Sequence, residues 1–130
     1  MPGVNTHTRI DRELNGSPEL LEDGYAVVKL RTTERMFADE RGLVHGGFLF
    51  SSADYSAMLA VNHPNVVLAG ANVRFLKPVR VGEEITFEAR VEKSEGKKII
   101  VSVVGYRERT EVFEGEFLCV VPEKHVLDGL

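Results

Sequence analysis

The residues best placed to do chemistry are two glycines and one acid in the stretch from His45 to Asn62, which reads HGGFLFSSADYSAMLAVN. Asp54 carries the one formal charge inside this apolar stretch. Burying an ionised carboxylate costs several kcal/mol or more unless it is paired or its pKa rises. Two interpretations of Asp54 follow: a carboxylate satisfied by nearby hydrogen-bond donors, or a reactive or ligand-facing group.

Gly46 and Gly47 stand at the predicted start of a helix, where backbone N–H groups lack intrahelical partners and the helix dipole is positive. Glycine lets a ligand approach these amides closely, so they can bind an anion or stabilise an oxyanion. Asp54 follows Gly47 by seven residues. That spacing is about two turns and roughly 10 Å along the axis, too far for one substrate carbonyl to reach both easily in one chain. Two such helices packed antiparallel bring the acid of one near the glycines of the other, so the spacing favours a two-fold dimer.

The helix that carries these residues, predicted over residues 45–62, must be buried. Apolar side chains surround it nearly completely, which is the pattern of a helix enclosed in a core. Pro64 stops it, because proline cannot continue a helix and disfavours helical backbone at the preceding residue. Strands need an apolar partner, and this helix is the one long apolar element, so the sheet is predicted to wrap it. The predicted fold class is α+β. The strands are predicted at 25–33, 66–79, 85–92, 98–107 and 112–121.

Residues 1–24 are polar and interrupted by glycine and proline, and we expect them to form an N-terminal extension. Arg9 to Leu14 predicts a short helical turn. Ser17 followed by Pro18 predicts the start of another short helix, with Ser17 as its cap. Residues 25–121 are predicted to form the one domain, followed by a short polar tail over residues 122–130.

Composition narrows the classes of function. The chain has 130 residues and a formal net charge of −4, whereas general nucleic-acid binders carry a basic footprint. No apolar run reaches the roughly 18 residues needed to span a bilayer, and the polar N-terminus lacks the apolar region of a signal peptide. Cys119 is the single cysteine, so no intrachain disulfide can form, and we expect a buried, inert thiol. The histidines show no metal-ligand spacing. We therefore expect a cytoplasmic protein with no nucleic-acid, membrane or metal partner.

The motif His45-Gly46-Gly47, with Asp54 seven residues after the second glycine, resembles the hotdog-fold acyl-CoA thioesterases of the PaaI-like, phenylacetate-degradation type. The resemblance extends into the predicted meander, NVRFLKPVRVGEEITFEARV, and covers roughly Tyr25 to Val121. It implies an antiparallel sheet wrapped around one long helix. It also implies hydrolysis of an acyl- or aryl-CoA by a homodimer or a homotetramer, with no cofactor beyond the coenzyme A of the substrate.

The resemblance also implies roles for individual residues. The Gly46 amide, next to Gly47, polarises the thioester carbonyl. Asp54 of the partner subunit acts as a nucleophile or as a general base on water, and the sequence leaves both roles open. His45 shapes the loop more than it acts as a base. The family's Asn, six residues before the His, is matched here by Asp39, which when ionised accepts hydrogen bonds but cannot donate one to a carbonyl.

Further residues are candidates for holding the substrate. The acyl or aryl group is expected in an apolar groove at the dimer interface. Its predicted lining is Phe48, Phe50, Tyr55 and Met58. The resemblance also implies that Asn72, a polar residue on the strand after the helix, reaches the partner's site. Arg74, Lys77 and Arg80 form a basic group around Pro78 that can meet the phosphates of coenzyme A.

Two other functions remain open at the level of the sequence. The first is a non-catalytic acyl-CoA sensor, since the meander also resembles the effector domain of a malonyl-CoA-responsive repressor of lipid synthesis. Asp54 favours the enzyme, because a sensor does not need that carboxylate, whereas Asp39 weakens the case for the enzyme. The second is a dehydratase of the same fold, which would use a histidine with a carboxylate in a different local motif.

Overall fold

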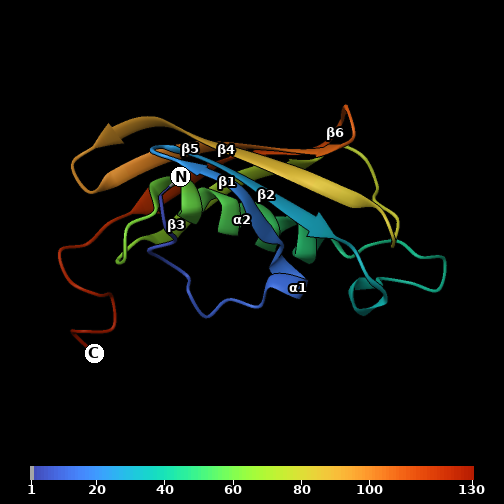
Figure 1. Cartoon of the computed structure of the whole chain (residues 1–130), viewed down its shortest axis with the longest axis horizontal. Helices are drawn as coiled ribbons and strands as arrows, with labels where there is room; N and C mark the ends of the chain where they lie inside the picture. Colours follow the sequence, from blue (N-terminus) through green and yellow to red (C-terminus); the bar gives the residue numbers. More distant parts are fainter. Residues whose placement is uncertain (1) are drawn as a thin grey trace.

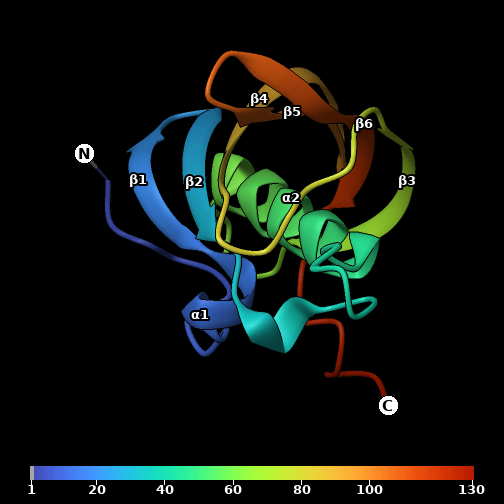
Figure 2. The same ribbon diagram turned by 90° about the vertical axis from the view of Figure 1, so that its right-hand side faces the viewer.

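The computed structural model describes residues 2–130, which form a six-stranded antiparallel sheet curled around one long helix, α2 (Gly46–Val61). Figure 1 shows the sheet above and the helix beneath it, and Figure 2 looks along α2 as the strands arch over it. The sheet order is β1-β2-β4-β5-β6-β3, so β1 and β3 form its edges. The strands are β1 (Ser17–Glu22), β2 (Tyr25–Arg31), β3 (Val67–Phe75), β4 (Glu84–Glu95), β5 (Lys98–Arg107) and β6 (Thr110–Val120). This is the predicted α+β hotdog fold.

Helix α2 confirms the predicted central helix to within one residue at each end. His45 stands at its N-cap with extended backbone (φ −64°, ψ 129°). Asn62 ends it in the left-handed conformation (φ 52°), and its N–H donates to the Met58 carbonyl. Side chains on several sides of the helix are fully enclosed, as the continuous apolar pattern predicts. The fully enclosed residues include Ala53, Ala57, Met58 and Leu59, each 0 % exposed.

The prediction of a short helix that starts at Ser17 and Pro18 is wrong. These residues begin β1, which pairs antiparallel with β2 from Ser17 opposite Lys29 to Glu22 opposite Tyr25. The physical reason lies in Leu21, which is 1 % exposed and reaches the core from this strand. The edge of β2 provides hydrogen-bond partners for the backbone of β1. Local propensity reveals neither this neighbouring strand nor the buried position of Leu21, because both depend on the tertiary fold.

The rest of the N-terminal segment packs along α2. The turn predicted at Arg9–Leu14 appears as α1 (Arg12–Asn15), capped by Asp11, whose carboxylate accepts from the backbone N–H groups of Glu13 and Leu14. The Asn62 side chain accepts from the N–H of Asn5 and donates to the carbonyl of Gly3. Ser52 Oγ, in the middle of α2, donates to the Asn15 carbonyl at 2.8 Å. The segment predicted as an extension thus closes one side of the helix.

Aromatic rings fill the space between α2 and the middle of the sheet. Phe87 on β4 and Phe113 on β6 meet edge to face with ring centroids 5.8 Å apart. Gly105 on β5 stands opposite both of them in the strand register. Its missing side chain leaves the room that the two rings occupy. Among residues 2–130, no helix is long and apolar enough to cross a membrane.

We expect Gly105→Ala to destabilise the fold. A Cβ at this position would lie 2.7 Å from Phe87 Cε1 and 3.2 Å from Phe113 Cβ, and both rings are 0 % exposed and cannot move aside. Overpacking of this kind should lower the free energy of unfolding by about 1–3 kcal/mol, measured by urea denaturation. The control is Gly70→Ala on β3, where a Cβ meets nothing within 4 Å. Equal stabilities of the two variants would contradict this account of the core.

Candidate active site

The N-terminus of α2 presents backbone amides that its own cap does not use. His45 makes no side-chain hydrogen bond to the first turn, and its backbone N–H donates instead to the Met36 carbonyl at 2.8 Å. A Cβ on Gly46 would lie 3.2 Å from Phe75 Cε1, and one on Gly47 would lie 2.9 Å from His45 Nε2. The phenyl and imidazole rings therefore flank the two glycines closely. This arrangement can offer N–H groups to an oxyanion.

Asp54 is a half-buried acid without a compensating donor. Its Oδ1 is inaccessible to solvent and has no hydrogen-bond partner within the described chain. Burial raises the pKa of Asp54 from 3.8 to about 6. Of the two interpretations, the carboxylate satisfied by nearby donors is thus not supported for this oxygen. A carboxyl with a pKa near neutrality is suited to take up or release a proton in catalysis.

Cys119 lies close enough to Asp54 for the charge of the carboxylate to affect the pKa of its thiol. Burial first, and the negative charge of Asp54 second, raise the pKa of the thiol to about 12. The side chain is 0 % exposed. These findings agree with the expected buried thiol, since a thiol with so high a pKa is not a nucleophile at neutral pH.

The glycines and Asp54 occupy different levels of one straight element. Both lie within α2, and a rise of 1.5 Å per residue separates Gly47 from Asp54 by roughly 10 Å along the axis. One chain therefore does not direct the Gly46 amide and the Asp54 carboxylate at the same carbonyl.

Asp39 closes the loop that leads into α2. Its Oδ1 accepts from the backbone N–H of Arg41 at 2.9 Å and of Leu43 at 3.2 Å. These two bonds explain why an acid can occupy the position: it acts as an acceptor for the loop, and an Asn carbonyl oxygen could accept in the same way. The predicted contact of Asp39 with substrate stays a prediction.

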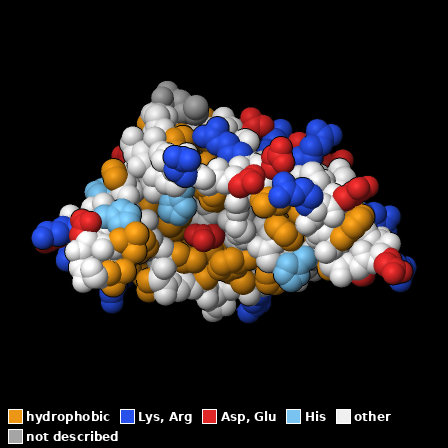
Figure 3. All heavy atoms as spheres, turned by 90° about the horizontal axis from the view of Figure 1, so that it is seen from below, with side chains coloured by type: hydrophobic (Ala, Val, Ile, Leu, Met, Phe, Trp, Pro, Cys, Tyr) orange, Lys and Arg blue, Asp and Glu red, His pale blue; other side chains and the backbone are white. Residues whose placement is uncertain are grey.

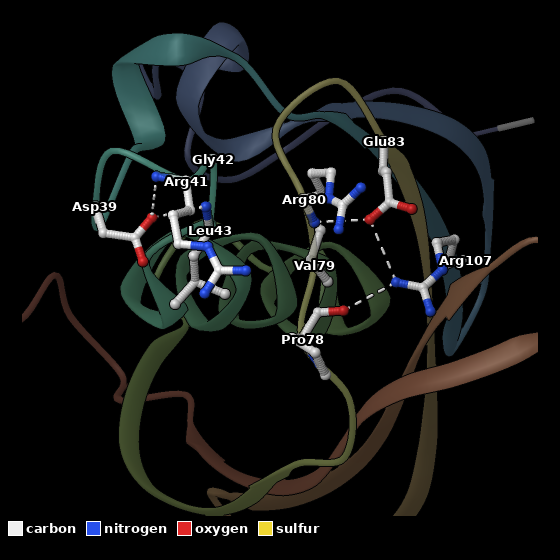
Figure 4. A pocket seen from close by; sticks show the side chains of 9 residues that line it. All are labelled: Asp39, Arg41, Gly42, Leu43, Pro78, Val79, Arg80, Glu83 and Arg107. Carbon is white, nitrogen blue, oxygen red and sulfur yellow. Dashed lines mark hydrogen bonds and ion pairs between the residues drawn. The ribbon is translucent and has the colours of Figure 1, made fainter.

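The predicted basic trio is divided in space. Arg80 lines a cavity of about 670 Å³ together with Arg41 and Arg107 (Figure 4). Arg74 instead borders a separate hollow of about 470 Å³, which Asn72 on β3 also lines. Sequence reasoning missed Arg41 and Arg107, because they come from other segments than Arg80 and carry no shared motif.

The expected groove lining is corrected at two positions. Tyr55 is 1 % exposed and Met58 is 0 % exposed, so both belong to the core of the protomer rather than to an open groove. Phe48 and Phe50 are half-buried and keep an accessible edge. A helix that is apolar on all sides gives no sign of which side faces out, which is why the sequence placed all four together.

Phe75 is the aromatic residue that sequence reasoning left out of the site. It ends β3, is 52 % exposed and packs over Gly46, and Leu76 beside it is 40 % exposed. Figure 3 shows hydrophobic side chains gathered on the face opposite the sheet, with an acidic side chain among them. The signal in the sequence that could have pointed to Phe75 was its alternation with Val73 on one face of the predicted strand.

Comparison with known proteins places these features in a family. A family model described as the thioesterase superfamily matches residues 41–114. A crystal structure of an uncharacterized protein from Pyrococcus horikoshii superposes with a TM-score of 0.96 at 54% identity, covering 98% of each chain.

Two curated relatives are longer than this chain. A methylthioribose-1-phosphate isomerase from Aquifex aeolicus is 59% identical over 117 residues, which make up 90% of this chain but 26% of that protein. A transcription factor FapR from Caldanaerobacter subterraneus is 30% identical over 95 residues, 73% of this chain and 48% of that protein. The chain thus spans about a quarter and about half of these relatives. The PaaI-like subtype stays a prediction. The family-model match over residues 41–114, which include the helix that opens with two glycines and its half-buried acid, shows that the chain belongs to the thioesterase superfamily.

Proposed function

We propose that this protein is an acyl-CoA thioesterase, which hydrolyses the thioester bond of an acyl- or aryl-CoA to the free acid and coenzyme A. The observation that carries the proposal is Asp54, a carboxylate with an unpartnered buried oxygen and a pKa of about 6. It lies on the same helix as an uncapped pair of glycine amides. An acid placed at this cost to stability, in a member of the thioesterase superfamily, is best explained by chemistry.

The proposed mechanism uses one group from each of two subunits. The Gly46 N–H donates to the thioester carbonyl oxygen and stabilises the negative charge that develops there. As a general base, the partner's Asp54 takes a proton from water as the water oxygen attacks the carbonyl carbon. The carbon–sulfur bond then breaks, and the thiolate of coenzyme A takes the proton back from the carboxylic acid. As a nucleophile, the same carboxylate would attack the carbonyl carbon, and the carbon–sulfur bond would break to give an acyl anhydride and the thiolate of coenzyme A. Water would then hydrolyse the anhydride to the free acid and the carboxylate of Asp54, and the proton that this water gives up would neutralise the thiolate.

A symmetric homodimer supports this mechanism, because a two-fold interface places each acid near the other subunit's glycines. β3 is an edge strand with unpaired backbone groups along one side. Phe75 and Leu76 add exposed apolar surface beside it. A homotetramer made of two such dimers would complete the same sites. The half-buried Phe48 and Phe50 are the remaining candidates for contact with the acyl or aryl group.

The second candidate function is binding of acyl-CoA without hydrolysis. It is favoured by the relatives named as transcription factors, of which the chain matches about half the length. Binding and hydrolysis differ in one measurable step, the release of free coenzyme A. Asp54 favours hydrolysis, because a binding site gains nothing from an unpartnered buried carboxylate.

Replacing the acid should abolish turnover while leaving the fold intact. We expect Asp54→Asn to reduce the release of coenzyme A from a panel of short, medium and aryl acyl-CoAs by about 10²-fold or more, since the amide cannot accept a proton or attack. Asp23→Asn is the matched control, because Asp23 is an exposed acid in the turn between β1 and β2 and lies outside the candidate site. Full activity in Asp54→Asn would remove Asp54 from the mechanism. A wild-type protein that binds the thioesters without hydrolysing them would favour the second candidate function.

Stability should change in the opposite direction from activity. A carboxyl whose pKa is raised on folding, here from 3.8 to about 6, destabilises the folded state progressively as the pH rises from about 4 through 6. Asp54→Asn should therefore raise the free energy of unfolding at pH 7 by about 1–3 kcal/mol, and the gain should vanish at pH 4. Urea denaturation at both pH values measures it. A variant less stable than wild type at pH 7 would contradict the unpaired state of the carboxylate.

The amide can be removed selectively. Gly46 is the first residue of α2, a position where proline fits a helix, and His45 already has the extended backbone that proline requires before it. We expect Gly46→Pro to lose hydrolytic activity because it deletes the N–H. Gly46→Ala, which adds the same Cβ against Phe75 and keeps the N–H, should retain more of it, as measured by kcat on the best thioester.

Mixed subunits test whether the two groups act across the interface. Heterodimers of Gly46→Pro and Asp54→Asn subunits carry one site with both groups intact, so an equal co-expressed mixture should regain about a quarter of wild-type activity. Each variant alone serves as the control. A mixture as inactive as its parents would contradict the shared site.

A further inference from the structure

We infer that Arg41, Arg80 and Arg107 form a phosphate-binding pocket beside the start of α2. It would take the phosphate groups of a nucleotide-type ligand, and the choice of coenzyme A as that ligand rests on the proposed function. The pocket is a cavity of about 670 Å³ lined from three segments that are distant in sequence. Figure 4 shows Arg41 on one wall and Arg80 with Arg107 on the other.

Backbone contacts hold the walls of the pocket together. Leu43 and Arg80 form an isolated antiparallel bridge, and the Val81 N–H donates to the Gly42 carbonyl at 2.8 Å. The Asp39 carboxylate fixes the Arg41 end of this loop through the two amides that it accepts. The cavity is therefore framed by paired backbone, which limits the entropy that a ligand must overcome on binding.

The two carboxylates in the pocket already accept hydrogen bonds, either from Arg107 or from backbone N–H groups. Glu83 Oε1 accepts from Arg107 Nη1 at 3.3 Å and from the Arg80 N–H at 2.7 Å. Arg107 Nη1 also donates to the Pro78 carbonyl at 2.9 Å. These contacts hold Arg107 beside Glu83 in the wall of the cavity and neutralise only part of the positive charge.

Two guanidinium groups keep their donors free. Within residues 2–130, neither the Arg41 nor the Arg80 side chain donates a hydrogen bond or forms an ion pair. The cavity thus holds three guanidinium groups against two carboxylates, in a chain whose formal net charge is −4. Planar guanidinium donors match phosphate oxygens in paired geometry. A phosphate ester or pyrophosphate is the anion that suits this donor set.

The pocket lies within reach of the proposed reaction site. Leu43 pairs with Arg80 and precedes Gly46 by three residues. The Cα atoms of Leu43 and Gly46 are therefore at most ~11 Å apart, even in an extended chain. A ligand with a thioester at one end and phosphates at the other, joined by a long flexible arm, can therefore occupy both places. Arg74 borders a different hollow and provides an internal comparison.

Binding of adenosine 3′,5′-bisphosphate, which has phosphates and no thioester, tests the pocket separately from turnover. Isothermal titration calorimetry should show affinity for wild type that falls roughly tenfold or more in Arg41→Ala and in Arg80→Ala, since each loses a charge-assisted hydrogen bond. Both side chains are exposed and make no internal contact that folding requires. Arg74→Ala is the matched control and should bind as wild type does. Pantetheine, which lacks these phosphates, should bind all four proteins alike.

The outcomes separate the pocket from the proposed function. A protein that binds the bisphosphate through Arg41 and Arg80 but hydrolyses no thioester retains the pocket and loses the thioesterase proposal. Active enzyme whose bisphosphate affinity is unchanged in Arg80→Ala, or equally weakened in Arg74→Ala, overturns the pocket. Coenzyme A binding more tightly than ADP supports coenzyme A as the source of the phosphates, whereas ADP binding as tightly overturns that assignment.

Discussion

Enclosure of α2 by the curled sheet is the constraint on which the other features depend. Ala53, Ala57 and Leu59 have no contact with solvent, so the helix is stable only with strands around it and with the N-terminal segment along one side. The same enclosure withdraws the Asp54 Oδ1 atom from water and raises the pKa of this half-buried carboxyl to about 6. The stability of the fold and the raised pKa of Asp54 therefore have one physical origin, the burial of a helix that carries a single charge.

The exposed end of that helix complements its buried middle. α2 begins with two glycines because a side chain at Gly46 or Gly47 would press against Phe75 or His45. Its first amides remain without a side-chain cap, which leaves the positive end of the helix dipole available. In the proposed mechanism, the amides that would stabilise the oxyanion and the acid that would accept a proton lie about two turns apart on one helix. A two-fold assembly is the simplest arrangement that would bring one of each together.

The loops before and after this region form the walls of the proposed phosphate pocket. The Asp39 carboxylate and the Leu43–Arg80 bridge join the approach to α2 with the connection between β3 and β4. This junction gathers Arg41, Arg80 and Arg107 around one cavity. Positive charge is concentrated near the helix start although the chain as a whole is acidic. The proposed phosphate pocket and the proposed thioester site therefore lie in the same corner of the fold.

The sequence by itself determined the helix, the meander and the candidate acid, because their signals are local. Ile85, Phe87 and Ala89 alternate with polar residues and lie buried on β4 as that pattern predicts, and the glycine–acid spacing of α2 depends only on helical rise. Tertiary structure decided what depends on distant partners. Ser17 begins a strand because β2 offers it an edge. Tyr55 and Met58 are buried in the core, and the sequence could not predict this because a helix that is apolar on all sides does not show which side faces solvent. The three arginines converge only where segments far apart in sequence meet in the fold.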